Sequence, residues 1–401
     1  MNESTNYAKP ITNTSQVIYD NYIRLISNNL SKLRNNKIVI FGAGVRGTLL
    51  SLILQEFGLN KIVFTDNNKQ LYGGRVNQFL ILPLDDIIEQ KEDIIILVSP
   101  ENSQDIIQQL LNFGFIEHKN LINFGTKLYD WFMEQFTDDQ RKDMFIVGDC
   151  GLMYFSLFDK IRDSLGTMLK KRFSEYKVKL LSMNAMGMRA FYNILSVQLK
   201  MFTKPKYVVM SIDLSMFNGK QHFLPNTQHV DLLERILYYS NEKNFQLKEY
   251  LQIAKKRYNN FDNKIITTKA YNSDKLSEAI NRSYIKMNYM YNHNIKNEEL
   301  VYFIKTLNML REEQIDVFPI VLPINYYQGK AYFGEKFIKS YCENSNFIKN
   351  IVNDKGYNLL DLSFLLEAEY FLDTTTIDEA ACYDGRLMAC DEIIRFFYNN
   401  Q

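Results

Sequence analysis

The residue best placed for covalent chemistry is Cys150, which follows directly after a strongly apolar segment. Residues 144–148 read Met-Phe-Ile-Val-Gly, typical of a buried strand, and Asp149-Cys150-Gly151 connects this strand to a predicted helix over 152–165. A cysteine at a helix N-terminus is favoured as a thiolate, because the helix dipole and unpaired N–H groups stabilise negative charge. The same N–H groups can hold a developing oxyanion. The pattern therefore predicts a nucleophile at Cys150, and the alternative is a small buried hydrophobic side chain.

A glycine-rich turn near the N-terminus predicts a phosphate-binding loop. Gly42, Gly44 and Gly47 stand in the order G-x-G-x-x-G, directly after the apolar segment 37–41. Glycines at this spacing allow a tight turn and a close approach of backbone to phosphate, and the following helix offers free N–H groups. Asp66 ends the next predicted strand, where a carboxylate can accept hydrogen bonds from a ribose. The alternative is a scaffold with the same loop and no ligand.

Strands that alternate with helices position both of these segments. The predicted strands cover residues 37–41, 61–66, 93–99, 120–124, 144–148, 177–182, 207–212, 316–322 and 358–361. The predicted helices cover residues 14–35, 44–57, 85–90, 102–113, 127–142, 152–165, 188–201 and 385–398. This alternation predicts an α/β protein with parallel sheets.

The strand series predicts two domains. A helical lead-in (1–35) precedes a small parallel-sheet, Rossmann-like domain (36–126), and a connecting helix (127–142) leads to a larger, flavodoxin-like α/β domain (143–401). A mostly helical stretch, 226–313, is rich in Tyr and Asn and reads as an insertion in the larger domain, where a protein partner could bind.

Composition and charge exclude several classes of protein. The chain has 47 Lys and Arg against 46 Asp and Glu, so its net charge of +1 creates no field that would attract nucleic acid or an anionic membrane. There is no apolar run long enough to span a membrane and no signal-peptide pattern at the N-terminus. Four cysteines without a C-x-x-C pair suit a reducing compartment, and four histidines argue against a histidine-rich metal site. We expect a cytoplasmic protein without a metal ion.

The first domain resembles a known group of domains. The segments that carry the resemblance are 38–47, 64–68, 73–76 and 82–84, which read IVIFGAGVRG, FTDNN, GGRV and LPL. They are similar to the small Rossmann-like domains of bacterial sugar-modifying enzymes, including the N-terminal domain of sugar N-acetyltransferases and domains appended to sugar methyltransferases. The resemblance implies a nucleotide sugar as ligand. A domain of this size leaves little room for nicotinamide chemistry.

The second domain resembles the SGNH (GDSL-like) hydrolases and acyltransferases. Gly148-Asp149-Cys150 is similar to the Gly-Asp-Ser block that opens this family, and Asn184-Ala-Met-Gly187 stands where the family has its oxyanion-hole glycine. Residues 204–213 resemble the strand that ends in an oxyanion-hole Asn, and residues 361–386 resemble the terminal block that carries the catalytic Asp and His. The resemblance implies acyl transfer or hydrolysis, with Gly187 in the oxyanion hole and Asp373 as base or orienting group.

Three family residues are replaced in this sequence. Cys150 stands for the nucleophilic Ser, Asp213 stands for the oxyanion Asn, and Thr376 stands for the catalytic His. A charged carboxylate at position 213 would oppose an oxyanion unless it were protonated or paired. A Ser-His-Asp esterase of the usual kind is therefore excluded.

Three interpretations remain for the second domain. Cys150 could act with a carboxylate base such as Asp373 or Asp378, because a thiol needs less activation than a hydroxyl. His222 or His229 could instead supply the base. The domain could also have lost catalysis and bind a carbohydrate or a protein.

Some further groups of residues have a structural and a functional interpretation. An acidic cluster could bind a divalent ion, and a basic stretch between 160 and 179 could contact a diphosphate, but a solvated surface explains both. The cluster is Asp373, Asp378, Glu379 and Asp384. Tyr284, Tyr289 and Tyr291 could stack on a sugar ring or pack in a core.

Together these observations predict an enzyme that modifies bacterial surface glycans or glycoproteins. It would transfer or hydrolyse an acyl-like group on a sugar or sugar-linked substrate, with Cys150 as nucleophile and a nucleotide or nucleotide sugar in the Gly42–Gly47 loop. The alternatives are a non-catalytic binding or assembly protein of the same pathway, and a transferase that binds S-adenosylmethionine in the first domain.

Overall fold

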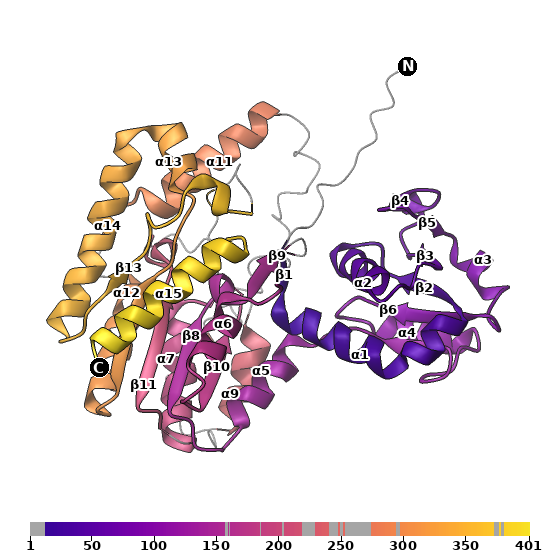
Figure 1. Ribbon diagram of the computed structural model, residues 1–401, viewed down its shortest axis with the longest axis horizontal. Helices are drawn as coiled ribbons and strands as arrows, with labels where there is room; N and C mark the ends of the chain where they lie inside the picture. The colour runs from indigo at the N-terminus through magenta and orange to yellow at the C-terminus, as the bar shows by residue number, and fades with distance from the viewer. Residues whose placement is uncertain are drawn as a thin grey trace. The chain divides into compact units, whose positions relative to one another are not determined.

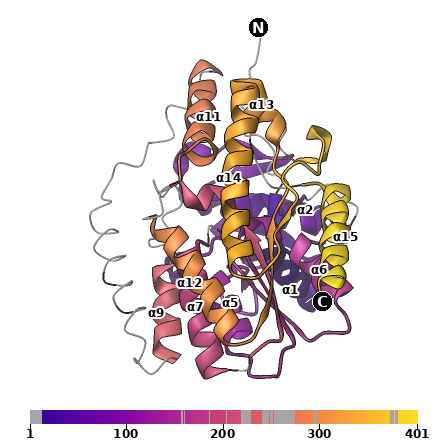
Figure 2. The same cartoon turned by 90° about the vertical axis from the view of Figure 1, so that its left-hand side faces the viewer.

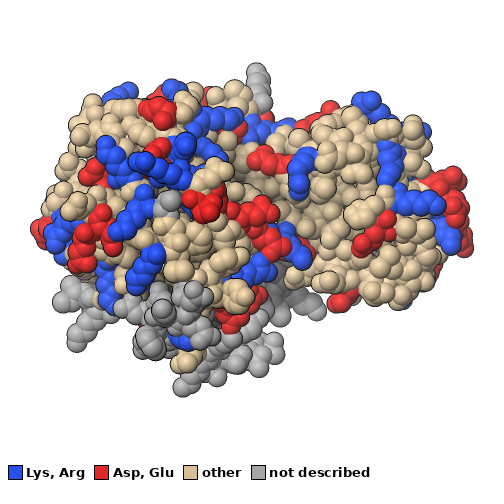
Figure 3. Space-filling view, turned by 90° about the horizontal axis from the view of Figure 1, so that it is seen from below, with Lys and Arg blue, Asp and Glu red and all other residues tan. Residues whose placement is uncertain are grey.

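The computed structural model shows an α/β protein built from two compact units, residues 1–128 and 129–401 (Figure 1). The structure describes residues 13–156, 159, 161–184, 186–202, 204–218, 229–239, 248, 252, 274–293, 297–372, 377 and 381–401. Among the helices in these ranges, none is both long and apolar enough to cross a membrane. On the face shown in Figure 3, basic and acidic side chains are interspersed on each unit.

The first unit has a six-stranded sheet in the order β4-β5-β3-β2-β6-β7. Its strands are β2 (Lys37–Phe41), β3 (Ile62–Thr65), β4 (Arg75–Val76), β5 (Phe79–Leu82), β6 (Ile94–Val98) and β7 (Leu121–Asn123), after a short β1 (Asn13–Ser15). All pairs are parallel except β4 with β5. Numbered along the chain, the five parallel strands have the Rossmann order 3-2-1-4-5. The strand-helix alternation predicted a parallel sheet but not this order. β4 and β5 are not among the strands predicted from the sequence.

Helices cover the sheet of the first unit. They are α1 (Gln16–Asn35), α2 (Val45–Glu56), α3 (Leu84–Ile88) and α4 (Gln104–Asn112), with a 3-10 turn η1 (Lys69–Leu71). Side chains of α3 and α4 pack with alternate residues of β2 and β6 into one hydrophobic core. Tyr22 and Ile26 of α1 are fully buried, so the predicted lead-in helix is an integral part of this unit.

The second unit has a five-stranded, fully parallel sheet in the order β10-β8-β11-β12-β13. The strands are β8 (Met144–Gly148), β10 (Val178–Ser182), β11 (Tyr207–Ile212), β12 (Asp316–Val321) and β13 (Leu360–Asp361), and β9 (Tyr154–Ser156) lies outside this sheet. Counted along the chain this is the order 2-1-3-4-5 of flavodoxin-like folds. The strands are almost completely buried, which is typical of a sheet covered on both faces.

Helices cover both faces of this sheet (Figure 2). One face packs against α6 (Leu165–Arg172) and α15 (Tyr383–Asn399), whose apolar residues form one core with β8, β11 and β12. The other helices are α5 (Leu128–Thr137), α7 (Met188–Met201), α9 (Val230–Tyr239), α11 (Asp274–Tyr289), α12 (Glu298–Glu312), α13 (Tyr326–Phe333) and α14 (Glu335–Asp354). Short 3-10 turns are η2 (Cys150–Leu152), η3 (Leu214–Phe217) and η5 (Ala368–Tyr370).

The predicted helix over 152–165 is wrong. After the 3-10 turn η2 the chain is extended in β9, and the helix α6 begins only at Leu165. The start signal is Ser164, whose Oγ accepts the N–H of Thr167 at 3.3 Å, the usual function of an N-cap serine. The apolar residues of Tyr154-Phe-Ser156 belong to a strand and not to a helix face.

The predicted insertion, 226–313, contains a helix that belongs to the sheet itself. α12 packs closely against α7 and leads directly into β12, so it is the crossover helix between the parallel strands β11 and β12. α9 and α11 also lie within 226–313.

Candidate functional site

The carboxyl ends of β8 and β11 form the position at which a fold of this order usually binds its ligand. In a 2-1-3-4-5 sheet the strand order reverses between the first and third strands, and the crevice outside their carboxyl ends is the common ligand site. Here these strands are β8 and β11, which pair directly. Met210 pairs with Val147, and Asp213 and Cys150 each follow three residues later.

Cys150 lies at this edge, but on a different local structure from the predicted one. It begins η2, a 3-10 turn of three residues, and its side chain is half-buried. The carboxylate of Asp149 accepts the Gly151 N–H at 3.2 Å and so takes up a donor of this turn. A turn this short has no helix dipole comparable to that of a full helix. The predicted activation of Cys150 by a helix N-terminus is therefore wrong.

Two buried carboxyl groups lie at the same edge of the sheet as Cys150. Asp149 and Asp213 follow neighbouring strands and are only 3% and 8% exposed. Each caps a 3-10 turn in the same way, since Asp213 accepts the Ser215 N–H at 2.8 Å. Burial, and then the charge of Asp213, raise the pKa of the Asp149 carboxyl to about 7. Burial and the neighbouring charge therefore favour the protonated form of Asp149.

From the sequence, Asp213 was a candidate site residue, whereas Asp149 had no predicted role in the site of its own. A signal was present, because Asp149 and Asp213 both come directly after apolar segments. What brings them together is the pairing of β8 with β11, and the sequence alone did not show that pairing.

Gly187 is buried and is the N-cap residue of α7, which agrees with its expected place at a helix start. The neighbouring amide of Arg189 donates to Oε2 of Glu299 at 3.0 Å. Glu299 comes from the first turn of α12, and burial raises the pKa of its carboxyl to about 7. One backbone N–H at the N-terminus of α7 is thus already hydrogen-bonded to the Glu299 carboxyl group. The oxyanion role of Gly187 stays a prediction.

His229 is the histidine that the structure brings to this region. It is buried, and its Nε2 donates to the carbonyl oxygen of Asn184 at 2.7 Å. The Asn184 amide in turn donates to the hydroxyl of Tyr154. His229 therefore contacts the segment that ends at Gly187. The other candidate, His222, lies outside the described residues.

The terminal block is described only in part. Asp373, Thr376, Asp378 and Glu379 lie outside the described residues, so their roles stay predictions. The start of α15 is held by Arg386, which is 3% exposed, pairs with Asp159 at 2.9 Å and donates to the carbonyl of Asp163. Within the described ranges, no three His, Cys, Asp or Glu side chains gather as a metal site would need.

Several other candidates have structural roles. Tyr289 and Tyr291 are buried, and the hydroxyl of Tyr291 donates to the carbonyl of Leu214 at 2.5 Å, so these rings pack inside the unit. In the basic stretch, Lys171 pairs with Asp163 and Lys179 is buried. The stretch therefore does not form one continuous exposed surface.

The glycine loop of the first unit has the geometry of a phosphate-binding turn. Gly42 has a φ of +105°, which favours glycine, and a Cβ at Gly47 would lie 1.9 Å from the Gly42 carbonyl oxygen. A Cβ at Gly44 would meet nothing within 4 Å, and Gly44 is the N-cap of α2. The three glycines thus provide the turn, the open approach and the close helix packing that the fingerprint requires.

Asp66 supports this loop from within. Its Oδ2 accepts the Ala43 N–H at 2.8 Å, and its Oδ1 accepts the Asn68 N–H at 2.9 Å. Both carboxylate oxygens therefore bind backbone of the first unit. The ribose contact expected for Asp66 stays a prediction, and the structure shows a loop-holding role instead.

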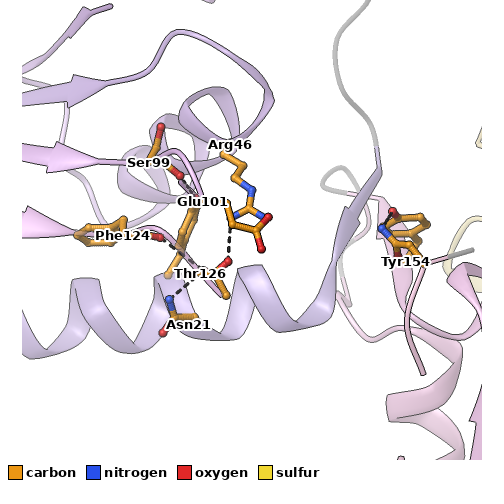
Figure 4. A network of polar contacts seen from close by, with 9 residues as sticks. Asn21, Arg46, Ser99, Glu101, Phe124, Thr126 and Tyr154 are labelled. Atoms are coloured by element: carbon orange, nitrogen blue, oxygen red, sulfur yellow. Dashed lines mark hydrogen bonds and ion pairs between the residues drawn. The ribbon is translucent and has the colours of Figure 1, made fainter. Parts of the chain in front are cut away.

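A polar network stiffens the carboxyl edge of this sheet (Figure 4). Arg46, in the first turn of α2, pairs with Glu101 at 2.6 Å and donates to the carbonyl of Thr126 at 3.0 Å. Asn21 of α1 donates to the Thr126 hydroxyl at 2.9 Å. The network connects the segments that follow β2, β6 and β7, so the loops around the glycine turn are held in fixed positions.

Comparison with known proteins identifies one related region. Residues 34–121 match the family described as C2185-like, N-terminal. The match starts just before β2, contains the glycine loop and ends at the first residue of β7. No curated protein matches the chain.

Proposed function

We propose that this protein is an enzyme that transfers or hydrolyses an acyl-like group on a sugar or sugar-linked substrate. The observation that carries the proposal is the position of Cys150, Asp149 and Asp213 together at the switch point of a 2-1-3-4-5 sheet. The resemblance to SGNH enzymes and to sugar-modifying domains supports the substrate class, bacterial surface glycans or glycoproteins.

In the proposed reaction, the Cys150 thiolate attacks the carbonyl carbon of the acyl donor after its proton has passed to a carboxylate base. The leaving group departs with a proton, and a thioester remains on Cys150. An acceptor hydroxyl or water then attacks the thioester carbonyl and releases the thiol. Asp373, outside the described residues, is the base that the family resemblance implies.

The buried acid pair offers a substitute for the missing oxyanion Asn. An Asn stabilises an oxyanion through its N–H donor, and a protonated carboxyl group can donate in the same manner. Because burial and the charge of Asp213 raise the pKa of Asp149, the Asp149 carboxyl group can carry the proton of such an O–H donor.

The first unit would hold the nucleotide part of a nucleotide or nucleotide sugar in the Gly42–Gly47 loop. The open space at Gly44 and the amides at the start of α2 support this role. A thermal-shift panel of nucleotide sugars, NAD and S-adenosylmethionine tests it, because a bound ligand raises the melting temperature. No shift with any of these compounds would favour a scaffold role for the first unit.

The nucleophile is tested by alkylation. Iodoacetamide labelling from about pH 5 to 9, with each cysteine followed by peptide mass spectrometry, should show Cys150 reacting faster than the other cysteines, because the proposed nucleophile needs an accessible thiol beside a base. Cys342 and Cys382 are half-buried in the same unit and serve as internal controls. Ordinary reactivity at Cys150, or full activity of a Cys150→Ala variant, would contradict the proposal.

A non-catalytic binding protein is the second candidate. It is favoured by the three-residue turn at Cys150, which lacks the helix dipole that would activate a thiol. An inert Cys150 together with binding of a glycan would support this candidate.

A further inference from the structure

Three aromatic rings meet where the segments after β12 and β13 run side by side. Tyr326 and Tyr327 begin α13, and Phe364 follows β13 by three residues. The Tyr326 ring lies 5.0 Å from that of Phe364 at an angle of 84°, and 4.2 Å from that of Tyr327 at 30°. Phe364 is 40% exposed, although aromatic residues of this size are usually buried. We call this group, with Glu367, the aromatic corner.

The aromatic corner is held in place from behind. The Leu362 N–H donates to the Val321 carbonyl at 2.9 Å, and the Ile324 N–H donates to the Ser363 carbonyl, so the two segments are joined by their backbones. The ring of buried Tyr341 packs against Phe364 at 5.5 Å. The rings are therefore held in place by packing and by the backbone bonds behind them.

The charge beside these rings is negative. The hydroxyl of Tyr327 donates to a carboxylate oxygen of Glu367, which is an exposed residue. The nearest lysine of α13, Lys330, pairs with Glu335 at 3.1 Å. Perpendicular aromatic faces beside a carboxylate are the arrangement that binds an ammonium group, because the ring faces and the carboxylate both attract positive charge.

The aromatic corner also lies at the sheet edge that carries the proposed active site. All strands of this sheet are parallel, so the carboxyl ends of β11, β12 and β13 point to the same edge. β13 is three strands from β8, the strand that precedes Cys150, which at about 4.8 Å per strand is about 14 Å. A substrate of two or three linked sugars with its reacting group near Cys150 can span this distance.

We propose that the aromatic corner binds an ammonium group of the substrate, such as the protonated amine of an amino sugar. The inference rests on the proposed function for the sugar, and on the rings and Glu367 for the charge. It assigns a substrate class to this edge of the sheet: a cationic sugar, in contrast to an anionic or neutral one.

The test is saturation-transfer difference NMR with three probes: tetramethylammonium, glucosamine and glucose. We expect tetramethylammonium and glucosamine to bind weakly and glucose not to bind. Phe364→Ala should weaken binding of both cations about twofold to fivefold, the effect of one ring at an exposed site. Glu367→Gln keeps the size of this exposed side chain and removes its charge. It should also weaken the binding of the two cationic probes. Tyr238→Ala, at an 81% exposed tyrosine of α9, is the control and should change nothing.

Each outcome decides the question. Equal binding of glucose and glucosamine would show a neutral sugar surface and overturn the inference. If neither Phe364→Ala nor Glu367→Gln alters binding of the cations, the amine binds elsewhere and the inference is overturned. If the cations do not bind at all, the inference is also overturned. Because a Cys150→Ala variant should bind the cations normally, failure here is distinguishable from failure of the proposed acyl chemistry.

Discussion

Replacing Asp149 by Asn should change how the stability of the second unit depends on pH. An ordinary aspartate has a pKa of 3.8, whereas the pKa of Asp149 in the folded protein is raised to about 7. The folded state therefore binds this proton more tightly than the unfolded state does. The free energy of unfolding should fall as pH rises from about 4 to 7, by about 1.36 kcal/mol per pKa unit or about 4 kcal/mol in total.

The Asp149→Asn variant should lose this contribution. Its neutral side chain keeps the oxygen that accepts the Gly151 N–H, so we expect the variant to be more stable than the natural protein at about pH 8 and similar at about pH 4. Urea unfolding followed by the fluorescence of Trp131, the only tryptophan, measures this, because Trp131 belongs to the second unit.

Two control variants define the expected result. Glu299→Gln should remove a separate part of the same pH dependence, because burial raises the pKa of Glu299 from 4.5 to about 7. Glu343→Gln, at an exposed position of α14, should leave the pH dependence unchanged. The reasoning is refuted if the Asp149→Asn variant shows the same loss of stability between about pH 4 and 8 as the natural protein.

Two further predictions concern packing. Arg386→Ala should lower the stability of the second unit by about 1.5 to 3 kcal/mol, since it removes the ion pair with Asp159 and the hydrogen bonds to the carbonyls of Asp163 and Ala381. Arg395→Ala, at a more exposed arginine of the same helix, should change the stability by about 0.5 kcal/mol or less. Thermal unfolding by circular dichroism measures both, and equal effects would contradict the role of Arg386. Gly47→Ala should destabilise the first unit because its Cβ would meet the Gly42 carbonyl at 1.9 Å, whereas Gly44→Ala should fold normally and weaken nucleotide binding; a well-folded Gly47→Ala protein would contradict the close packing.

Local patterns in the sequence were enough to predict the class of the fold and most of its strands. Continuous apolar segments such as 144–148 and 207–212 are strands because both faces of a parallel sheet are buried. The glycine spacing of Gly42, Gly44 and Gly47 predicted the loop geometry, since each position has a steric requirement that the other side chains do not meet.

The details around Cys150 depended on longer-range interactions. The sequence by itself shows an acid and a cysteine after a strand, and a helix after them was a reasonable prediction. In the folded chain Asp149 caps a short turn and β9 follows, because contacts far along the sequence, such as the bond from the Tyr383 N–H to Asp159, position the segment beyond it.

Only the tertiary structure decided which chemical groups meet. Asp149 and Asp213 are separated along the chain, and they lie together because β8 pairs with β11 and not with β12. The aromatic corner likewise arises from the neighbouring carboxyl ends of β12 and β13. Residue types and local spacing determine the secondary structure, whereas strand order determines the neighbours of each strand end, and a parallel sheet brings those ends to one edge.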